Sequence, residues 1–267
     1  MILTKTAALC ILDAINKKEK WIGIGINLDP ERVFSGIGKY SGVWPIKCYI
    51  SDNVRIPSTF KGQYIRSETP EKDLIRDLQS GVIEVAVRGT LPANDTLHLL
   101  RQSCGVRELM RIVLMESYDG HQFFLAPVGV DEGYSISQKI EFIKKGRELC
   151  RKYGISDKVS VLSGGRLGDI GRHCIVDRSL ADGELIAKVT GAEHTGILIE
   201  EAILKSGLII APDGISGNLI FRTLLFLGKG HSYGAPVVNI DKKFVDTSRV
   251  NPDYHYALNL AGSLIID

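Results

Sequence analysis

Short apolar runs alternate along the chain with longer stretches in which apolar residues recur at helical spacing. The continuous apolar runs predict buried strands at residues 21–26, 82–87, 112–116, 122–126, 159–162, 208–211 and 236–240. The amphipathic stretches predict helices at residues 69–80, 135–153, 193–206, 215–227 and 252–261. The apolar first fifteen residues are interrupted by Lys5 and Asp13, so they predict an amphipathic helix that is too short to span a bilayer.

Two of these helices carry explicit start and stop signals. Thr69 precedes Pro70, a residue favoured in the first turn of a helix, and Gly81 follows the last residue of the pattern. Gly154 ends the 135–153 pattern in the same way. Helices of this kind that alternate with buried strands predict an α/β fold with mostly parallel sheets.

The composition limits the possible partners. The 267 residues are 44% hydrophobic and 24% charged, with a net charge of +2, which is typical of a globular chain of about two domains. A nearly neutral chain has no general attraction for nucleic acid or membranes, so we expect neither partner, and any anion must bind at a local cationic cluster. The five cysteines form no C-x-x-C pair, which predicts reduced thiols in a cytoplasmic protein.

Several cofactor and metal motifs are incomplete. The G-x-G at 23–25 is followed by Leu28 where a dinucleotide fingerprint needs its third glycine, and the 36–39 run lacks the Ser or Thr of a phosphate loop. The six histidines show no metal-binding spacing, and the D-x-H runs at 119–121 and 253–255 lack the glycine of a corrinoid motif. We therefore predict no metal and no tightly bound cofactor.

The first segment with candidate chemistry follows the strand at 159–162. It contains the turn Ser163, Gly164 and Gly165, followed by Arg166. Backbone N–H groups at a strand-to-helix turn beside a guanidinium can hold an anion. The same pattern also fits a plain tight turn whose arginine faces solvent, and both interpretations stay open.

The second segment follows the strand at 208–211. There Asp213 stands in a Pro-Asp-Gly turn, and Gly217 and Asn218 lie at the start of the next predicted helix. Ligands of open α/β sheets bind outside the carboxyl ends of strands, which favours a substrate contact here. The alternative is that Asn218 only caps the helix.

The third segment is near the C-terminus. Ser248 and Arg249 form a hydroxyl–guanidinium pair, and Asp253 and His255 follow one or two turns later. A guanidinium can stabilise a developing anion, and either following residue can act as a base.

Four runs of residues carry a family resemblance. In order, VLSGGRLGDIGR, VDRSLADGELIAK, APDGISGNLIFR and VDTSR resemble motifs of phosphate acetyl- and butyryltransferases and of acyl-ACP phosphate acyltransferases. That resemblance covers residues 69–267. Over its whole length the chain is more similar still to the methanogenesis marker protein 4 family, also named putative methyltransferase mtx subunit X-related.

The resemblance implies a fold of two α/β domains of the isocitrate/isopropylmalate dehydrogenase-like, phosphotransacetylase type. One domain would hold residues 1–102 and 238–267, and the other, residues 103–237, would pair the enzyme as a homodimer. The active site would lie in the interdomain cleft, where the pair at 248–249 would face the turn at 163–165.

The resemblance also implies roles for single residues. Ser248 would steady the thiolate of coenzyme A, and Arg249 would clamp the acyl phosphate with help from Arg166 and Arg88. The general base of the acyltransferases is an aspartate seven residues after the serine, and His255 occupies that position here. Asp253 is the alternative base.

Three functions follow as hypotheses. The leading one is a transferase, associated with methanogenesis, that acts on an acyl phosphate or other small anion with a thiol acceptor, so that coenzyme A or another thiol coenzyme is a substrate. The second is a methyltransferase, or a subunit of one, that uses a corrinoid bound to a partner protein. The third is a non-catalytic, ligand-binding scaffold.

Overall fold

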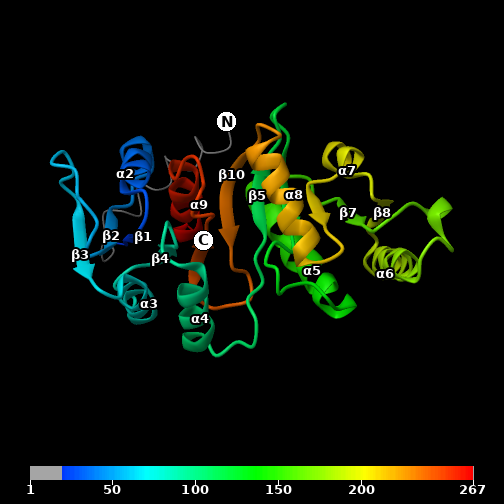
Figure 1. Ribbon diagram of the computed structural model, residues 1–267, viewed down its shortest axis with the longest axis horizontal. Helices are drawn as coiled ribbons and strands as arrows, with labels where there is room; N and C mark the ends of the chain where they lie inside the picture. The colour runs from blue at the N-terminus through cyan, green and yellow to red at the C-terminus, as the bar shows by residue number, and fades with distance from the viewer. Residues whose placement is uncertain (1–19, 267) are drawn as a thin grey trace. The chain divides into compact units, whose positions relative to one another are not determined.

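The computed structural model describes residues 20–266, which form two compact units (Figure 1). Unit 1 consists of the described chain up to Leu109 and from Tyr233 onward, and unit 2 is Met110–Ser232. The boundaries predicted after residues 102 and 237 lie close to these positions. The helix predicted in the first fifteen residues lies outside the described part of the chain.

The sheet of unit 1 is parallel except for one strand. Neighbours pair in parallel from β3 through β2, β1 and β4 to β11, and β10 pairs antiparallel with β11. In spatial order the strands are β3 (Gln63–Ser67), β2 (Ile46–Ser51), β1 (Ile22–Ile26), β4 (Val85–Val87), β11 (Lys243–Asp246) and β10 (His231–Pro236). Parallel strands with helices on both faces appear in sequence as continuous apolar runs. The strand predicted from WIGIGI is therefore confirmed as β1, in which every residue is buried.

Helices cover both faces of this sheet (Figure 1). α2 (Pro30–Lys39) and α9 (His255–Ile265) lie on one face, and α3 (Pro70–Ser80) and α4 (Ala93–Ser103) lie on the other. The predicted helix with Pro70 in its first turn is confirmed as α3, which ends at Gly81 with φ +73°. The C-terminal chain returns to this unit, since β11 pairs with β4 and α9 packs against both strands.

Unit 2 has its own mixed sheet. β6 pairs antiparallel with β5, and β6, β9, β7 and β8 pair in parallel. In spatial order the strands are β5 (Val113–Glu116), β6 (Gln122–Ala126), β9 (Leu208–Ile210), β7 (Val159–Leu162) and β8 (Glu193–Gly196). The helices are α5 (Ile136–Tyr153) and α6 (Cys174–Thr190) on one face and α7 (Ile199–Lys205) and α8 (Gly214–Phe226) on the other, and the short 3-10 helix η1 (Leu167–Asp169) follows β7 (Figure 1). Mostly parallel sheets with helices on both faces confirm the predicted α/β class.

Two predicted elements were wrong. Residues 193–206 do not form one helix, because the first four form β8 beside β7 and the helix begins at Ile199. The strand predicted at 236–240 ends at Pro236 and extends toward the N-terminus instead.

Other elements were not predicted, and α2 shows why. Gly36 and Gly38 lower its helix propensity, so no helix was predicted there. Gly36 is needed there, since a Cβ would lie 2.9 Å from the Tyr254 Cβ. Tertiary packing thus selects a helix that local propensity disfavours.

None of the described helices is both long enough and apolar enough to cross a membrane. Cys48, Cys104, Cys150 and Cys174 are free thiols. Burial raises the pKa of Cys48 and of Cys150 to about 12, so neither is a reactive thiolate at neutral pH.

The close approach of β1 to the end of β4 gives the first testable prediction. Gly89 has φ +61°, and a Cβ there would collide with the Gly25 carbonyl oxygen. Gly81 has φ +73° but open space around it, so Gly81→Ala should cost only the left-handed strain of ~1–2 kcal/mol. Gly89→Ala should cost an additional ~1–3 kcal/mol, measured by urea denaturation. Equal losses for the two variants would contradict the close approach.

Candidate functional site

The carboxyl ends of β1, β4 and β11 are neighbours, because these strands are parallel and adjacent. Thr90, just after β4, is fully buried and connects two of these ends. Its hydroxyl accepts bonds from the N–H groups of Asn27 at 2.9 Å and Leu28 at 3.1 Å, and its N–H donates to Gly25. The ends of parallel strands are where α/β proteins bind ligands, so this edge is a candidate site.

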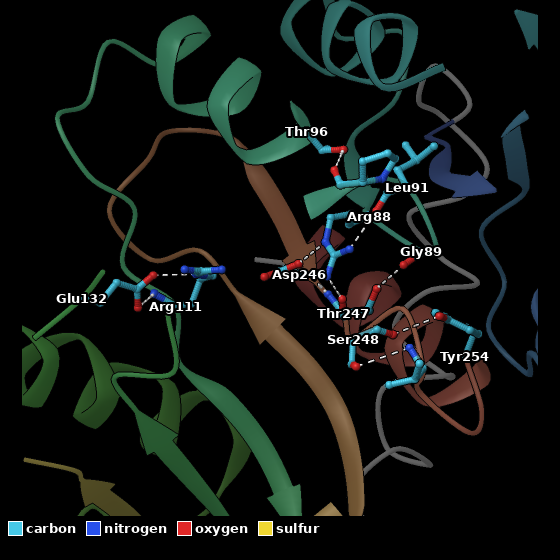
Figure 2. Close-up of polar contacts among 12 residues, drawn as sticks. Arg88, Gly89, Leu91, Thr96, Arg111, Glu132, Asp246, Thr247, Ser248 and Tyr254 are labelled. Carbon is cyan, nitrogen blue, oxygen red and sulfur yellow. Dashed lines mark hydrogen bonds and ion pairs between the residues drawn. The ribbon is translucent and has the colours of Figure 1, made fainter. Parts of the chain in front are cut away.

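Arg88 holds the ends of β4 and β11 together (Figure 2). Its guanidinium donates to the Asp246 carboxylate, to the Thr247 carbonyl and, at 2.8 Å, to the Leu91 carbonyl. The Thr247 hydroxyl donates to the Gly89 carbonyl at 2.9 Å. Arg88 is only 4% exposed. The sequence predicted that Arg88 grips a substrate anion, whereas here its guanidinium bonds to protein acceptors, which favours a positioning role.

The turn after β11 is fixed through the Ser248 backbone (Figure 2). The Ser248 carbonyl accepts from the Asn251 N–H at 3.0 Å and from the Tyr254 hydroxyl at 3.0 Å, and the Ser248 hydroxyl accepts from the Val250 N–H at 3.4 Å. Tyr254 is fully buried, and burial raises its pKa to about 12. Ser248 is half-buried and Arg249 is exposed. A rigid backbone therefore presents a guanidinium to solvent.

Asp253 ties the start of α9 to α2. Its carboxylate accepts from Lys39 Nζ at 2.7 Å and from the His255 N–H at 3.1 Å, and Oδ1 lies 2.8 Å from His255 Nδ1. Burial opposes ionisation, but these contacts outweigh it and hold the pKa of Asp253 below its usual value. Within residues 20–266, no hydrogen bond joins the Ser248 hydroxyl to Asp253 or His255. The Asp253 carboxylate thus lies beside the imidazole, and both Asp253 and His255 stay predicted bases.

The turn after β7 is largely filled by the protein's own acceptors. The N–H groups of Ser163, Gly164 and Arg166 donate to Gly196 O at 2.9 Å, Ser179 Oγ at 2.8 Å and Asp169 Oδ2 at 2.8 Å, respectively. These N–H groups are therefore bonded within the protein, which favours the tight turn over the anion cradle of the two interpretations. The Arg166 side chain is exposed, so a guanidinium still stands at the end of β7.

The turn after β9 also has structural contacts. Asp213 caps α8 by accepting the Ser216 N–H at 2.8 Å, and Asn218 donates to the Val128 carbonyl at 2.9 Å. Gly217 lies so close to the Pro127 carbonyl that a side chain could not fit. The prediction that Asp213, Gly217 and Asn218 bind substrate is not supported by these contacts, which instead fix the start of α8.

Two features of unit 2 were not predicted. Glu132 is 2% exposed, and Arg111 donates to it through Nε at 2.5 Å (Figure 2). Burial raises the pKa of Glu132, and Arg111 opposes that shift. Lys139 on α5 is 7% exposed, and burial lowers its pKa while Asp182 and Asp213 oppose the shift. No sequence motif marks these residues, because their partners are distant along the chain.

The predicted site residues fall into two groups. Unit 1 holds Arg88, Ser248, Arg249, Asp253 and His255, all after β4 or β11. Unit 2 holds the predicted residues after β7 and β9. The described residues contain no group of three or more His, Cys, Asp or Glu side chains arranged to hold a metal ion.

Comparisons with known proteins give sequence relatives. No family model matches the chain. It is 48% identical, over 207 residues, to a protein of Methanosarcina barkeri named "Putative methyltransferase mtx subunit X", with 76% of each chain covered. It is 40% identical, over 67% of its own length and 77% of the relative's, to a Methanocaldococcus jannaschii protein named as an uncharacterized methyltransferase.

Solved structures give the fold. A branched-chain phosphotransacylase from Enterococcus faecalis matches with a TM-score of 0.70 at 14% identity, over 92% of this chain and 99% of that one. A phosphotransacetylase from Streptococcus pyogenes matches with a TM-score of 0.64 at 14% identity, over 98% of both chains. At this identity the likeness concerns the fold alone, and the expected phosphotransacetylase-like α/β fold is confirmed.

The contrast between the two arginines of unit 1 is testable. Arg88→Met would remove the buried guanidinium that bonds to the Asp246 carboxylate and to the Leu91 and Thr247 carbonyls, so we expect a loss of ~3–5 kcal/mol in unfolding free energy. Arg249→Met removes an exposed charge and should change stability by no more than ~0.5 kcal/mol. Chemical denaturation measures both. If Arg88→Met is as stable as Arg249→Met, the positioning role is wrong.

Proposed function

The chain belongs to the family of the putative methyltransferase mtx subunit X, and from that premise we propose that it is a transferase for a small anionic substrate. We propose an acyl phosphate as the substrate class and a thiol, such as coenzyme A, as the acceptor. One observation carries the proposal: Arg249 is exposed on a turn whose backbone is held by buried partners at the carboxyl end of β11. The phosphotransacylase-like fold supports the same reaction class.

In the proposed reaction, the thiol loses its proton to a base and its sulfur attacks the acyl carbonyl. A carbon–sulfur bond forms, the bond between the carbonyl carbon and the phosphate oxygen breaks, and phosphate leaves with the electron pair. Arg249 would stabilise the charge on the phosphate, and the Ser248 hydroxyl would donate to the thiolate. We assign proton transfer to His255, because the Asp253 carboxylate is already engaged by Lys39.

One residue of unit 2 has a role in the proposed reaction. Arg166 is exposed at the end of β7 and can supply a second cation for the anionic substrate. That it acts with Arg249 in an interdomain cleft stays a prediction from the family resemblance. The same holds for the association with methanogenesis.

A methyltransferase, or a subunit of one, is the second candidate function. The observation that favours it is the name given to the relatives from methanogens, in which "subunit X" suggests a member of a complex. The corrinoid would then be bound by a partner protein, since the D-x-H runs of this chain lack the motif's glycine. Recovery of a corrinoid protein with the tagged chain, together with methyl transfer by the mixture, would favour this function.

The acyl-transfer proposal predicts phosphate release from acetyl or butyryl phosphate that depends on coenzyme A. Arg249→Ala should lower kcat/KM by about 10²–10³, the usual effect of removing one donor to a developing anion. Arg151→Ala, which removes a similarly exposed guanidinium from α5, is the matched control and should keep full activity. Equal activity of Arg249→Ala and wild type would rule out this site.

A binding measurement separates the candidates when no turnover is seen. A true ligand at 100 times its Kd should stabilise the protein by ~2.7 kcal/mol, which a thermal-shift assay detects. Coenzyme A, coenzyme M and acyl phosphates form the panel. A response without turnover would favour the third candidate, a ligand-binding scaffold, and no response to any of them would contradict both the transferase and the scaffold.

We also propose that unit 2 forms a homodimer through α8. On this helix Ile215 is 52% exposed and Leu219 is 62% exposed, with Phe226 and Leu227 exposed at its other end. A cluster of exposed large apolar side chains normally marks a surface that another protein covers. A second copy fits this face because the family resemblance predicts pairing through this part of the chain.

The dimer prediction has a matched control. Leu219→Glu places a charge in the proposed interface and should convert the dimer to a monomer by light scattering, without loss of helical content. Val82→Glu alters a residue of unit 1 that is also about half exposed, at 48%, and should leave the dimer intact. A wild-type chain that is monomeric at micromolar concentration would contradict the proposal.

A further inference from the structure

A line of hydrogen-bonding groups runs from the surface of unit 2 into the turn after β7. Glu184 Oε1, on α6, lies 2.8 Å from His194 Nδ1, on β8, and His194 Nε2 lies 2.8 Å from Ser163 Oγ. The Ser163 hydroxyl also donates to the Gly165 carbonyl at 3.1 Å. The Glu184 side chain is 54% exposed, whereas the His194 side chain is 5% exposed. The line therefore joins solvent to the buried interior of the turn.

The fold makes room for this imidazole. Gly183 lies in the middle of α6, where glycine costs ~1 kcal/mol of helix propensity relative to alanine. A Cβ at this position would lie 2.7 Å from His194 Nε2. Glycine thus allows the ring to sit between the helix and the turn.

Counting hydrogens gives the charge of the ring in this arrangement. When the single hydrogen of the Ser163 hydroxyl is donated to Gly165, His194 Nε2 carries the hydrogen in its own contact with Ser163. His194 Nδ1 must also carry a hydrogen, because the Glu184 carboxylate only accepts. Both ring nitrogens are donors in this placement of the hydroxyl hydrogen, which corresponds to an imidazolium, whereas a neutral ring accepts from the Ser163 hydroxyl at Nε2.

We infer that His194 and Glu184 are positioning residues, which hold Ser163 and thereby the Gly164–Gly165 turn in a proton-dependent conformation. When the imidazolium loses the proton on Nε2, the Ser163 hydroxyl turns to donate to that nitrogen. The Gly165 carbonyl then loses its donor, and the turn that presents Arg166 relaxes. The proton goes to solvent, and no other bond forms or breaks.

The charges around His194 leave Glu184 as its ionic partner. On α6, Asp182 is bonded to Arg178 at 2.9 Å. On α7, Lys205 is bonded to Glu201 at 2.9 Å and lies 3.6 Å from Glu193, the neighbour of His194 on β8. The residues of β7 are uncharged, and the Lys188 and Arg166 side chains are exposed.

The same three side chains resemble a nucleophile–base–acid triad, but the geometry does not favour that function. Ser163 is 2% exposed, and its hydroxyl lies within hydrogen-bonding distance of a carbonyl of its own turn, at 3.1 Å. A nucleophile must reach a substrate carbonyl. A positioning role needs no such access.

The structural part of the inference is tested by NMR on the full chain during a pH titration. The Gly165 amide resonance should move with the same midpoint as the His194 ring protons. Ser163→Ala should leave the His194 titration in place and abolish the response of Gly165. Glu184→Gln should shift the shared midpoint to lower pH, and Glu193→Gln, on the same strand, should leave it nearly unchanged. A Gly165 amide chemical shift that does not change as His194 titrates would overturn the inference.

Two further variants test the same coupling between His194 and Gly165 if Ser163→Ala does not fold. Gly183→Ala should displace the ring and uncouple Gly165 from His194, although alanine favours the helix. His194→Gln should remove the pH response of Gly165 while retaining the fold by circular dichroism. Labelling of Ser163 by a fluorophosphonate probe would overturn the positioning role, because it would make Ser163 an accessible nucleophile.

The consequence for catalysis rests on the proposed function. If wild type transfers acyl groups, Glu184→Gln should move the pH profile of KM for the acyl phosphate and leave the limiting kcat nearly unchanged. If wild type is inactive, the NMR coupling still stands, so failure of the proposed function is distinguishable from failure of this inference.

Discussion

The ion pair between Arg88 and Asp246 is the contact on which the unit 1 site depends. It joins the end of β4 to the end of β11, which are far apart in the sequence and parallel in the sheet. The same guanidinium fixes the Thr247 carbonyl, so the chain enters the next turn in one direction. A buried pair of this kind is strongly disfavoured when one partner is missing, which makes it a constraint on geometry more than a source of stability.

The two turns that carry the predicted chemistry differ in how they are held and in what they expose. In unit 1, buried acceptors and donors hold the backbone around Ser248, while the next side chain, Arg249, is exposed. In unit 2, the backbone N–H groups after β7 are bonded internally, and the turn is linked to an imidazole and a surface carboxylate. The first turn suits direct contact with an anion, and the second suits adjustment by protonation.

The sequence predicts the elements whose signals are local. Continuous apolar residues predict β1, Pro70 and Gly81 mark both ends of α3, and the order of strands and helices predicts the α/β class. Local signals fail where a distant partner decides the outcome. No helix was predicted around Gly36, because Tyr254, which packs against it, lies far along the chain. Residues 193–196 were predicted as helix, because β7, the strand with which they pair, is a separate segment of the chain. The family resemblance predicts roles for Ser248 and Arg249, which stay predictions, but nothing local indicated that Arg88 would bond to Asp246 and Thr247.

The central claim is that Arg249, held by this framework, binds the anionic part of a substrate. Isothermal titration calorimetry of butyryl phosphate with wild type and with Arg249→Gln tests it most directly. We expect at least tenfold weaker binding by the variant, or ~1.4 kcal/mol, with an unchanged melting temperature. Identical affinities for the two proteins, or no binding to wild type at millimolar ligand, would contradict it.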